Sequence, residues 1–286
     1  MQDLQTFIDL LSKGRKIHIS ILDLDGLLNT PITTVAVCNT IHSKPFCDAA
    51  KSTERGFRRC LGCKGRANRK AVESKTCFSG HCPWGIYEAA IPVVVQGTVS
   101  AIVYVGNYII DEEKSRELIS RSARLTGVDE TKVLSHLSEC EYLSDAEEAF
   151  KIGELVRDYI LALVKNNVAD NSSLHWLTLK MKRHAEAFYT SDISLKDLAR
   201  IYHKNEKYMG RIFKSELGMS FGEYCISLRL DRAKDMLLNT NEKIIDVALA
   251  LGFNNVPYFN RVFKKQYGVT PSEFKRREGK ARLSNS

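Results

Sequence analysis

One short pattern occurs twice near the end of this 286-residue chain, and it constrains the fold more than any other feature. Arg211–Lys214 reads Arg-Ile-Phe-Lys and is followed by Gly218, while Arg261–Lys264 reads Arg-Val-Phe-Lys and is followed by Gly268. Further matches lie upstream and pair Asp197-Leu198-Ala199 with Asp246-Val247-Ala248. A duplicated helical unit with a cation at a fixed place predicts two similar elements that meet two similar surfaces. The grooves of double-stranded DNA, equivalent one turn apart, are the first partner to consider.

The net charge of +8 is concentrated in the C-terminal part of the chain. Residues 174–286 contain 21 of the 42 Lys and Arg residues but only 12 of the 34 Asp and Glu residues. This asymmetry predicts a polyanion-binding module beside a nearly neutral one. A solvated basic face is the alternative, and the repeat favours nucleic acid over it. The length is sufficient for two ordinary domains.

Capping residues predict a pair of helices around each copy of the repeat. Ser194 and Asp197 predict a capped helix over 195–202, followed by a turn at 203–205 and a second helix that ends at Gly218. The second copy predicts a turn at 252–255 and a helix over 256–267. Ser220 and Glu223 form a capping box that opens a long helix between the pairs. Two helix-turn-helix units separated by a stiff helix are therefore expected.

The second helix of each pair is expected to carry the residues that read DNA. Their side chains should face outward, and they are Lys207, Gly210, Arg211, Lys214, Val256, Asn260, Arg261 and Lys264. Tyr208, Ile212 and Phe213 are expected to pack inward. A guanidinium donates two hydrogen bonds to guanine, worth about 1–3 kcal/mol of discrimination. A lone surface arginine usually serves solubility, but two at matching places favour a reading role.

These motifs resemble the DNA-binding domain of the AraC/XylS family of transcription regulators. The matching residues include Ser194–Ala199, Tyr208–Lys214, Phe221–Tyr224, Gly252-Phe253, Tyr258–Lys264 and Gly268–Phe274. The resemblance implies two helix-turn-helix units that read successive major grooves, in an all-α domain over 174–286. An activator of this kind would also meet RNA polymerase and could act as a homodimer. Gly210 departs from the family, which more often has a polar side chain there.

The N-terminal part predicts a mixed α/β domain over 1–165, followed by a polar linker at 166–173. Helices are expected at 3–11, 54–74, 111–125 and 145–164, and strands at 16–22 and 32–37. Residues 87–95 and 98–108 predict a hairpin that turns at Gln96-Gly97. Asp23-Leu-Asp25-Gly26 has the form of a phosphatase motif, but two nearby acids after a strand more often form a turn.

Cysteine is the most distinctive residue type in this part of the chain. Six of the eight cysteines lie between Cys38 and Cys82. The thiols of Cys47, Cys60, Cys63 and Cys82 can form a tetrahedral site for zinc or another thiolate-bound metal. The alternative is that they pack as small buried hydrophobes. Cys140 and Cys225 are isolated and are expected in the core.

The same region is similar to the PocR-type sensory domain, a PAS-like module. The resemblance rests on Phe46–Asp48, Arg59–Cys63, Cys82–Ile86, Ile91–Val93 and Tyr104–Asn107. It implies that a small organic effector, of the diol or short-hydrocarbon type, binds this domain. Side chains near the hairpin that could orient such a molecule are Trp84, Tyr87, Glu88 and Tyr104. They would equally serve as amphipathic core.

A DNA-binding transcription regulator controlled by a small effector is thus the leading hypothesis, with activation as the expected mode. A metal or thiol redox sensor that drives the same DNA-binding domain is the second. Catalysis is not expected, because no Ser-His-Asp layout, Walker loop or GxGxxG motif is present. The N-terminus has no signal-peptide pattern and no membrane partner is expected, so a cytoplasmic protein with reduced thiols is predicted.

Overall fold

The computed structural model describes residues 3–40, 42–165, 174–240 and 242–276, and it divides into two compact units. The first unit comprises Met1–Leu177 and Lys196–Glu206, and the second comprises Thr178–Leu195 and Lys207–Ser286. The predicted linker at 166–173 lies outside the described residues, as do residues 277–286. Domain limits at 165 and 174 therefore stay predictions.

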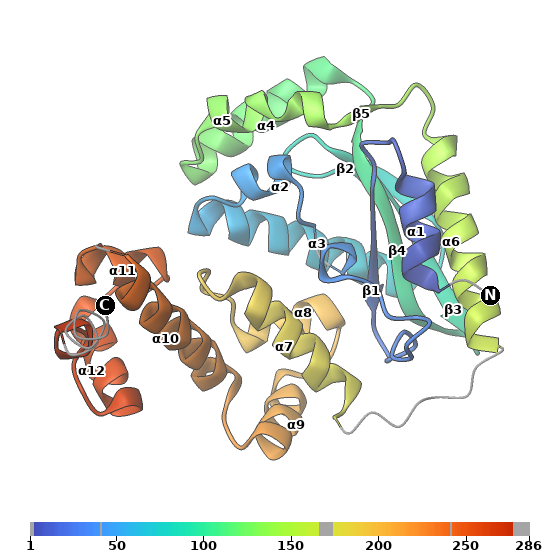
Figure 1. The fold of residues 1–286 in the computed structure, drawn as a ribbon. Coiled ribbons are helices and arrows are strands. Elements are labelled where there is room, and N and C mark those ends of the chain that lie inside the picture. The colour runs from blue at the N-terminus through green and yellow to red at the C-terminus, as the bar shows by residue number, and fades with distance from the viewer. Residues whose placement is uncertain (1–2, 41, 166–173, 241, 277–286) are drawn as a thin grey trace. The chain divides into compact units, whose positions relative to one another are not determined.

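The first unit is built on a five-stranded sheet with the order β1-β4-β3-β2, and β5 pairs with the end of β4 (Figure 1). The strands are β1 (His18–Asp23), β2 (Phe78–His81), β3 (Tyr87–Val95), β4 (Thr98–Ile109) and β5 (Glu141–Tyr142). The predicted hairpin is confirmed. Its turn residues Gln96 and Gly97 have φ angles of 49° and 79°, as a two-residue hairpin turn requires.

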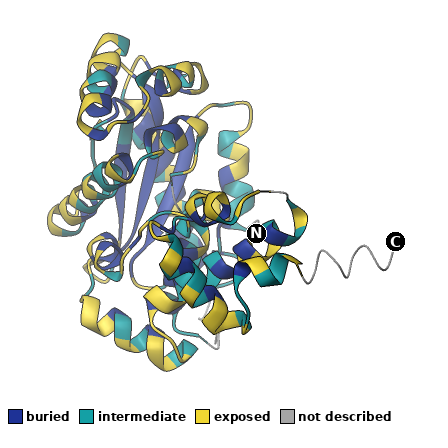
Figure 2. Cartoon of the chain, turned by 90° about the vertical axis from the view of Figure 1, so that its left-hand side faces the viewer, coloured by how far each residue is buried: buried dark blue, intermediate teal, exposed yellow. Residues whose placement is uncertain are grey.

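The two faces of this sheet have different chemistry. One face packs against α1 (Leu4–Ser12) and α6 (Glu147–Lys165) through a hydrophobic cluster that includes Ile91 and Val105. The other face is covered by α3 (Glu54–Ser74) and carries polar side chains, among them Glu88 and Tyr104. Because side chains alternate along a strand, neighbouring residues of β3 and β4 serve opposite faces. Figure 2 shows the strands buried and the outer sides of the helices exposed.

Shorter elements complete the first unit. They are η1 (Val37–Asn39), α2 (Pro45–Ala50), α4 (Glu112–Thr126), α5 (Glu130–Ser135) and η2 (Leu137–Glu139). The predicted strand at 32–37 is wrong. The backbone there turns instead, because the amides of Thr33 and Thr34 both donate to the carbonyl of Thr30.

The paired acids at the end of β1, Asp23 and Asp25, belong to a turn. The carboxylate of Asp23 accepts hydrogen bonds from the amides of Gly26, Leu27 and Leu28, at 2.9, 2.9 and 3.2 Å. Asp23 is buried, and its two oxygens are used to close the loop. The interpretation as a turn is confirmed.

The described part of the second unit is helical. Its helices are α7 (Trp176–Phe188), α9 (Glu206–Leu217), α10 (Phe221–Asn239), α11 (Ile244–Ala250) and α12 (Val256–Tyr267). The predicted capping box at Ser220 and Glu223 opens α10. Helix α8 (Leu195–Tyr202) lies almost entirely within the first unit. None of the described helices combines the length and the apolar character that crossing a membrane requires.

Candidate functional sites

The two copies of the repeat bury equivalent side chains. Met209 in α9 and Phe259 in α12 are fully buried, and so are Phe213 and Phe263 one helical turn later. Each helix ends at a glycine with positive φ, which is 71° at Gly218 and 77° at Gly268. The two helices are therefore similar in their packing as well as in their sequence.

The cations of the repeat lie on the opposite side of each helix. Arg211 and Lys214 in α9 are exposed, as are Arg261 and Lys264 in α12. At 100° per residue, Arg211 lies about 200° around the helix from both Met209 and Phe213. Arginine and lysine three positions apart share one face. Each helix thus presents a basic stripe to solvent, as predicted, and Lys207 is exposed as well.

Four other residues of these helices differ from the expected exposure. Val256 is half-buried and packs against the core of the second unit. Asn260 is also half-buried, with its side-chain oxygen enclosed. Gly210 is half-buried against Leu195, and Tyr208, expected inside, is 41% exposed. Tyr208 faces solvent because the buried apolar stripe of α9 consists of Met209 and Phe213, which are four positions apart, and Tyr208 lies beside that stripe.

Arg229 in α10 fastens the turn before α12, a role that its sequence position does not reveal. Its guanidinium donates to the carbonyl of Gly252 at 2.8 Å, to that of Ser191 at 3.0 Å, and to that of Tyr189. Gly252 has a φ of 78°, and a Cβ there would lie 2.1 Å from the carbonyl oxygen of Thr190. A side chain is thus excluded where the turn meets the loop after α7.

A polar network lies between α3 and the sheet in the first unit. The Glu88 carboxylate meets the His42 imidazole at 2.5 Å and the Lys64 ammonium at 3.3 Å. Burial would raise the pKa of Glu88, but His42 and Lys64 outweigh burial and lower this pKa to about 2. Burial also lowers the pKa of His42. Glu88 is therefore an anion held inside the unit.

The same network extends to Tyr104 and Asn68. The Lys64 ammonium lies 3.1 Å from the centroid of the Tyr104 ring, and the Tyr104 hydroxyl donates to the Asn68 side chain at 2.5 Å. Lys64 and Asn68 are four positions apart on α3 and so share its inner face. His18 borders the network, with its ring 5.1 Å from that of His42. We call His18, His42, Lys64, Asn68, Glu88 and Tyr104 the sensor network.

The structure brings together two of the four residues predicted to orient an effector. Glu88 and Tyr104 both belong to the sensor network. Tyr87 is on the other face of β3, where it packs against the apolar cluster and donates to the Ser79 hydroxyl at 2.5 Å. Trp84 is buried in a separate cluster with α2, α4 and α5. Sequence reasoning did not place His42 and Lys64, which both reach from outside β3, beside Glu88.

The four cysteines predicted to bind metal lie in one region. Cys47 is on α2, Cys60 and Cys63 are on α3, and Cys82 follows β2; burial raises the pKa of each thiol, for Cys47 to about 12. Neighbouring thiols raise the pKa of Cys82 further. Within the described ranges, no three Cys, His, Asp or Glu side chains are grouped to hold a metal ion. Cys140 and Cys225 are buried as expected.

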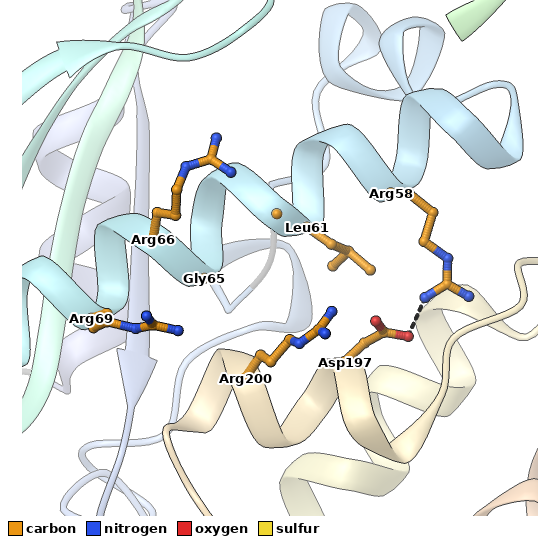
Figure 3. Close-up of a pocket in the computed structure, with 8 residues that line it drawn as sticks. Arg58, Leu61, Gly65, Arg66, Arg69, Asp197 and Arg200 are labelled. Carbon is orange, nitrogen blue, oxygen red and sulfur yellow. Dashed lines mark hydrogen bonds and ion pairs between the residues drawn. The ribbon is translucent and has the colours of Figure 1, made fainter.

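Helix α8 is tied to α3 within the first unit by two polar contacts. The Asn68 side chain, fully buried, donates to the main-chain carbonyl of Ile201 at 2.8 Å. Arg58 forms an ion pair with Asp197, which is 7% exposed (Figure 3). Asn68 therefore contacts both Tyr104 of the sensor network and α8, whose residues open the first copy of the repeat.

Two family models match separate parts of the chain. The sensory domain found in PocR matches residues 1–167, and a helix-turn-helix domain matches residues 198–277. The regulatory protein PocR of Salmonella typhimurium is 21% identical over 247 residues, which is 81% of this chain and 82% of that protein.

Other relatives match a smaller share of the chain. The bifunctional transcriptional activator/DNA repair enzyme AdaA of Bacillus subtilis is 36% identical over 100 residues, 35% of this chain and 47% of AdaA. The chain spans under half the length of the first curated relatives that it matches.

A solved structure matches a similar share of the chain. The C-terminal domain of AraT, a response regulator from Geobacillus stearothermophilus, is 30% identical, with a TM-score of 0.35, over 37% of this chain and 88% of that one. The family matches span both parts of the chain. This chain belongs to the AraC-type DNA-binding transcription regulators that carry the sensory domain found in PocR.

Proposed function

We propose that a small organic effector binds at the sensor network and controls DNA binding through the contact between Asn68 and α8. The hydrogen-bonded sequence from Tyr104 through Asn68 to the carbonyl of Ile201 is the observation that supports this. The sensor network holds a carboxylate, an ammonium and a phenol within a buried site. Such groups suit a short molecule with hydroxyl groups, which matches the diol class implied by the sequence resemblance.

The proposed control depends on which hydrogen bonds Asn68 makes. An effector hydroxyl that competes for the Tyr104 hydroxyl removes the donor to the Asn68 side-chain oxygen, and the Asn68 side chain then reorients. A buried group left without its partner costs about 1–3 kcal/mol, so the hold on Ile201 weakens by a similar amount. A coupling of 1–3 kcal/mol changes an affinity about 5- to 150-fold. Release of α8 from α3 would free the first copy of the repeat to dock on DNA.

The proposed mode of DNA recognition uses α9 and α12 in neighbouring major grooves. Arg211 and Arg261 would each donate to a guanine, and the lysines would meet phosphates. We propose that the protein is an activator, which contacts RNA polymerase once α8 is released. Binding to DNA as a homodimer is compatible with this arrangement. The two half-sites are expected about one helical turn apart.

The test measures DNA affinity of the full chain with and without short-chain diols. Asn68→Ala should give effector-independent binding, because α8 is no longer held. Asn107→Ala is the matched control: Asn107 is also buried and bridges two carbonyls, of Lys16 and Glu139, but it does not reach α8. The control should lose stability and keep its response. An Asn68→Ala protein that responds to the diol as the parent does contradicts the proposal.

The second candidate is thiol or metal sensing, which the convergence of Cys47, Cys60, Cys63 and Cys82 favours. The raised pKa values weigh against it, since protonated thiols are poor ligands and nucleophiles. Elemental analysis of protein purified without oxygen tests this candidate. Absence of zinc and iron, together with unchanged DNA binding by Cys60→Ala, would remove it.

A further inference from the structure

A cavity of about 400 Å³ opens between α3 and α8 in the first unit, and its walls are rich in arginine (Figure 3). The lining residues are Arg58, Leu61, Gly62, Gly65, Arg66, Arg69, Asp197 and Arg200. The volume falls within the range of about 300–1,000 Å³ that is usual for small-molecule sites. This cavity is separate from the sensor network, which lies on the sheet-facing side of α3.

The charge of the cavity is unbalanced. Its single carboxylate, Asp197, is paired with Arg58. Arg66, Arg69 and Arg200 are exposed, and in the described part of the chain no ion pair to them is found. Figure 3 shows Arg200 extending from α8 toward α3. Three guanidinium groups around one hollow repel each other, and a multivalent anion would relieve that repulsion.

Two glycines on the cavity side of α3 point to the same conclusion. Gly62 and Gly65 lie inside a 21-residue helix, where glycine weakens helix formation relative to alanine. A Cβ at Gly62 would come no closer than 3.6 Å to a neighbour, and one at Gly65 no closer than 3.9 Å. Packing therefore does not require either glycine. Their absent side chains keep the floor of the cavity open, which is what a ligand close to the backbone needs.

We propose that this cavity is a binding site for a small polyanion of the pyrophosphate or phosphorylated-metabolite class. Arginine forks match phosphate oxygens in pairs of parallel hydrogen bonds. Arg66 and Arg69 hold the anion from α3, and Arg200 holds it from α8. A concave site of this size favours a small molecule over a DNA backbone phosphate, which protruding side chains usually contact. The proposal does not depend on an effector at the sensor network.

The test uses inorganic pyrophosphate and the full chain, with binding measured by calorimetry at constant ionic strength. The paired substitution Arg69→Ala with Arg200→Ala should weaken binding at least tenfold. Its control is Arg55→Ala with Arg124→Ala, which removes the same charge from exposed arginines outside the cavity. A second control, Arg211→Ala with Arg261→Ala, accounts for pyrophosphate at the DNA-reading helices. Both controls should keep most of the binding.

A cavity-filling variant separates a shaped site from general attraction to positive charge. Gly65→Leu keeps every arginine and fills the floor, so it should abolish pyrophosphate binding while the melting temperature stays the same or rises. Undiminished binding by Gly65→Leu and by the Arg69/Arg200 variant would overturn the proposal. A lower salt dependence of DNA binding in the Arg69/Arg200 variant, with unchanged pyrophosphate binding, would assign these arginines to the DNA backbone and overturn it as well.

Discussion

Asp197 and Asp246 hold the same position in the two copies of the repeat and have opposite surroundings. Asp246 is exposed to solvent, whereas Asp197 is buried and paired with Arg58 of α3. If the repeat alone decided the surroundings of these two aspartates, both would be equally exposed. The burial of Asp197 and its ion pair with Arg58 show that α8, unlike α11, is held by α3 of the first unit.

Replacing Asp197 by asparagine should raise DNA affinity in the absence of effector. The substitution keeps the shape of the side chain and removes the charge that Arg58 holds, so α8 is released more readily. We expect a gain of about fivefold or more, measured by fluorescence anisotropy with a labelled duplex. Asp246→Asn makes the same change in the second copy and should leave affinity nearly unchanged. Equal effects of the two variants would mean that the ion pair has no regulatory role.

Arg211→Ala and Arg261→Ala should each relax base preference in a different half-site. Loss of one bidentate contact costs about 1–3 kcal/mol against the preferred base and little against the others. Affinities for duplexes with substitutions in one half-site at a time provide the measurement. Arg232→Ala, an exposed arginine on α10, is the control and should keep the full preference. If both reader variants retain the parent's preference at every base, α9 and α12 do not read the sequence.

Gly153→Ala should destabilise the first unit although alanine favours a helix. A Cβ at Gly153 would lie 2.2 Å from Cδ1 of Ile91, which is fully buried and has little room to move. Overpacking of this kind costs about 1–3 kcal/mol. Gly210→Ala is the contrasting variant. Its Cβ would lie 3.1 Å from the end of the Leu195 side chain, which can rotate away. Alanine also favours the helix by about 1 kcal/mol relative to glycine. Urea unfolding should move the two midpoints in opposite directions.

The second unit should lose stability between about pH 6.5 and pH 4 because of His184. Burial, with Lys180 nearby, lowers the pKa of His184 from 6.5 to about 4. Above pH 6.5 the folded and unfolded states both hold a neutral ring. As pH falls, the unfolded state binds the proton first, so the free energy of unfolding decreases until the folded state also binds it.

The measurement is denaturant unfolding at pH 7 and pH 5 with a probe in the second unit. His184→Gln should flatten the difference between the two pH values, whereas His203→Asn, at an exposed position, should not. A pH response that survives His184→Gln unchanged would assign it to other groups.

Most elements could be predicted from local patterns. The helix at 195–202 and the helix at 256–267 have the predicted limits, because caps and apolar spacing act within a few residues. The short elements α2, α5, β2 and β5 were not predicted, and the strand expected at 32–37 became a turn held by Thr30. Segments this short carry too few residues for a period to appear, so long-range contacts decide them.

The candidate sites divide in the same way. Exposure of Arg211 and Arg261 follows from helical spacing alone, so the repeat by itself determined the basic faces of α9 and α12. Tertiary structure alone decided that Glu88 meets His42 and Lys64, and that Asp197 meets Arg58, 139 positions earlier in the chain. The physical reason is distance along the chain: capping and periodicity are interactions between near neighbours, whereas a buried ion pair exists only after separate elements have packed.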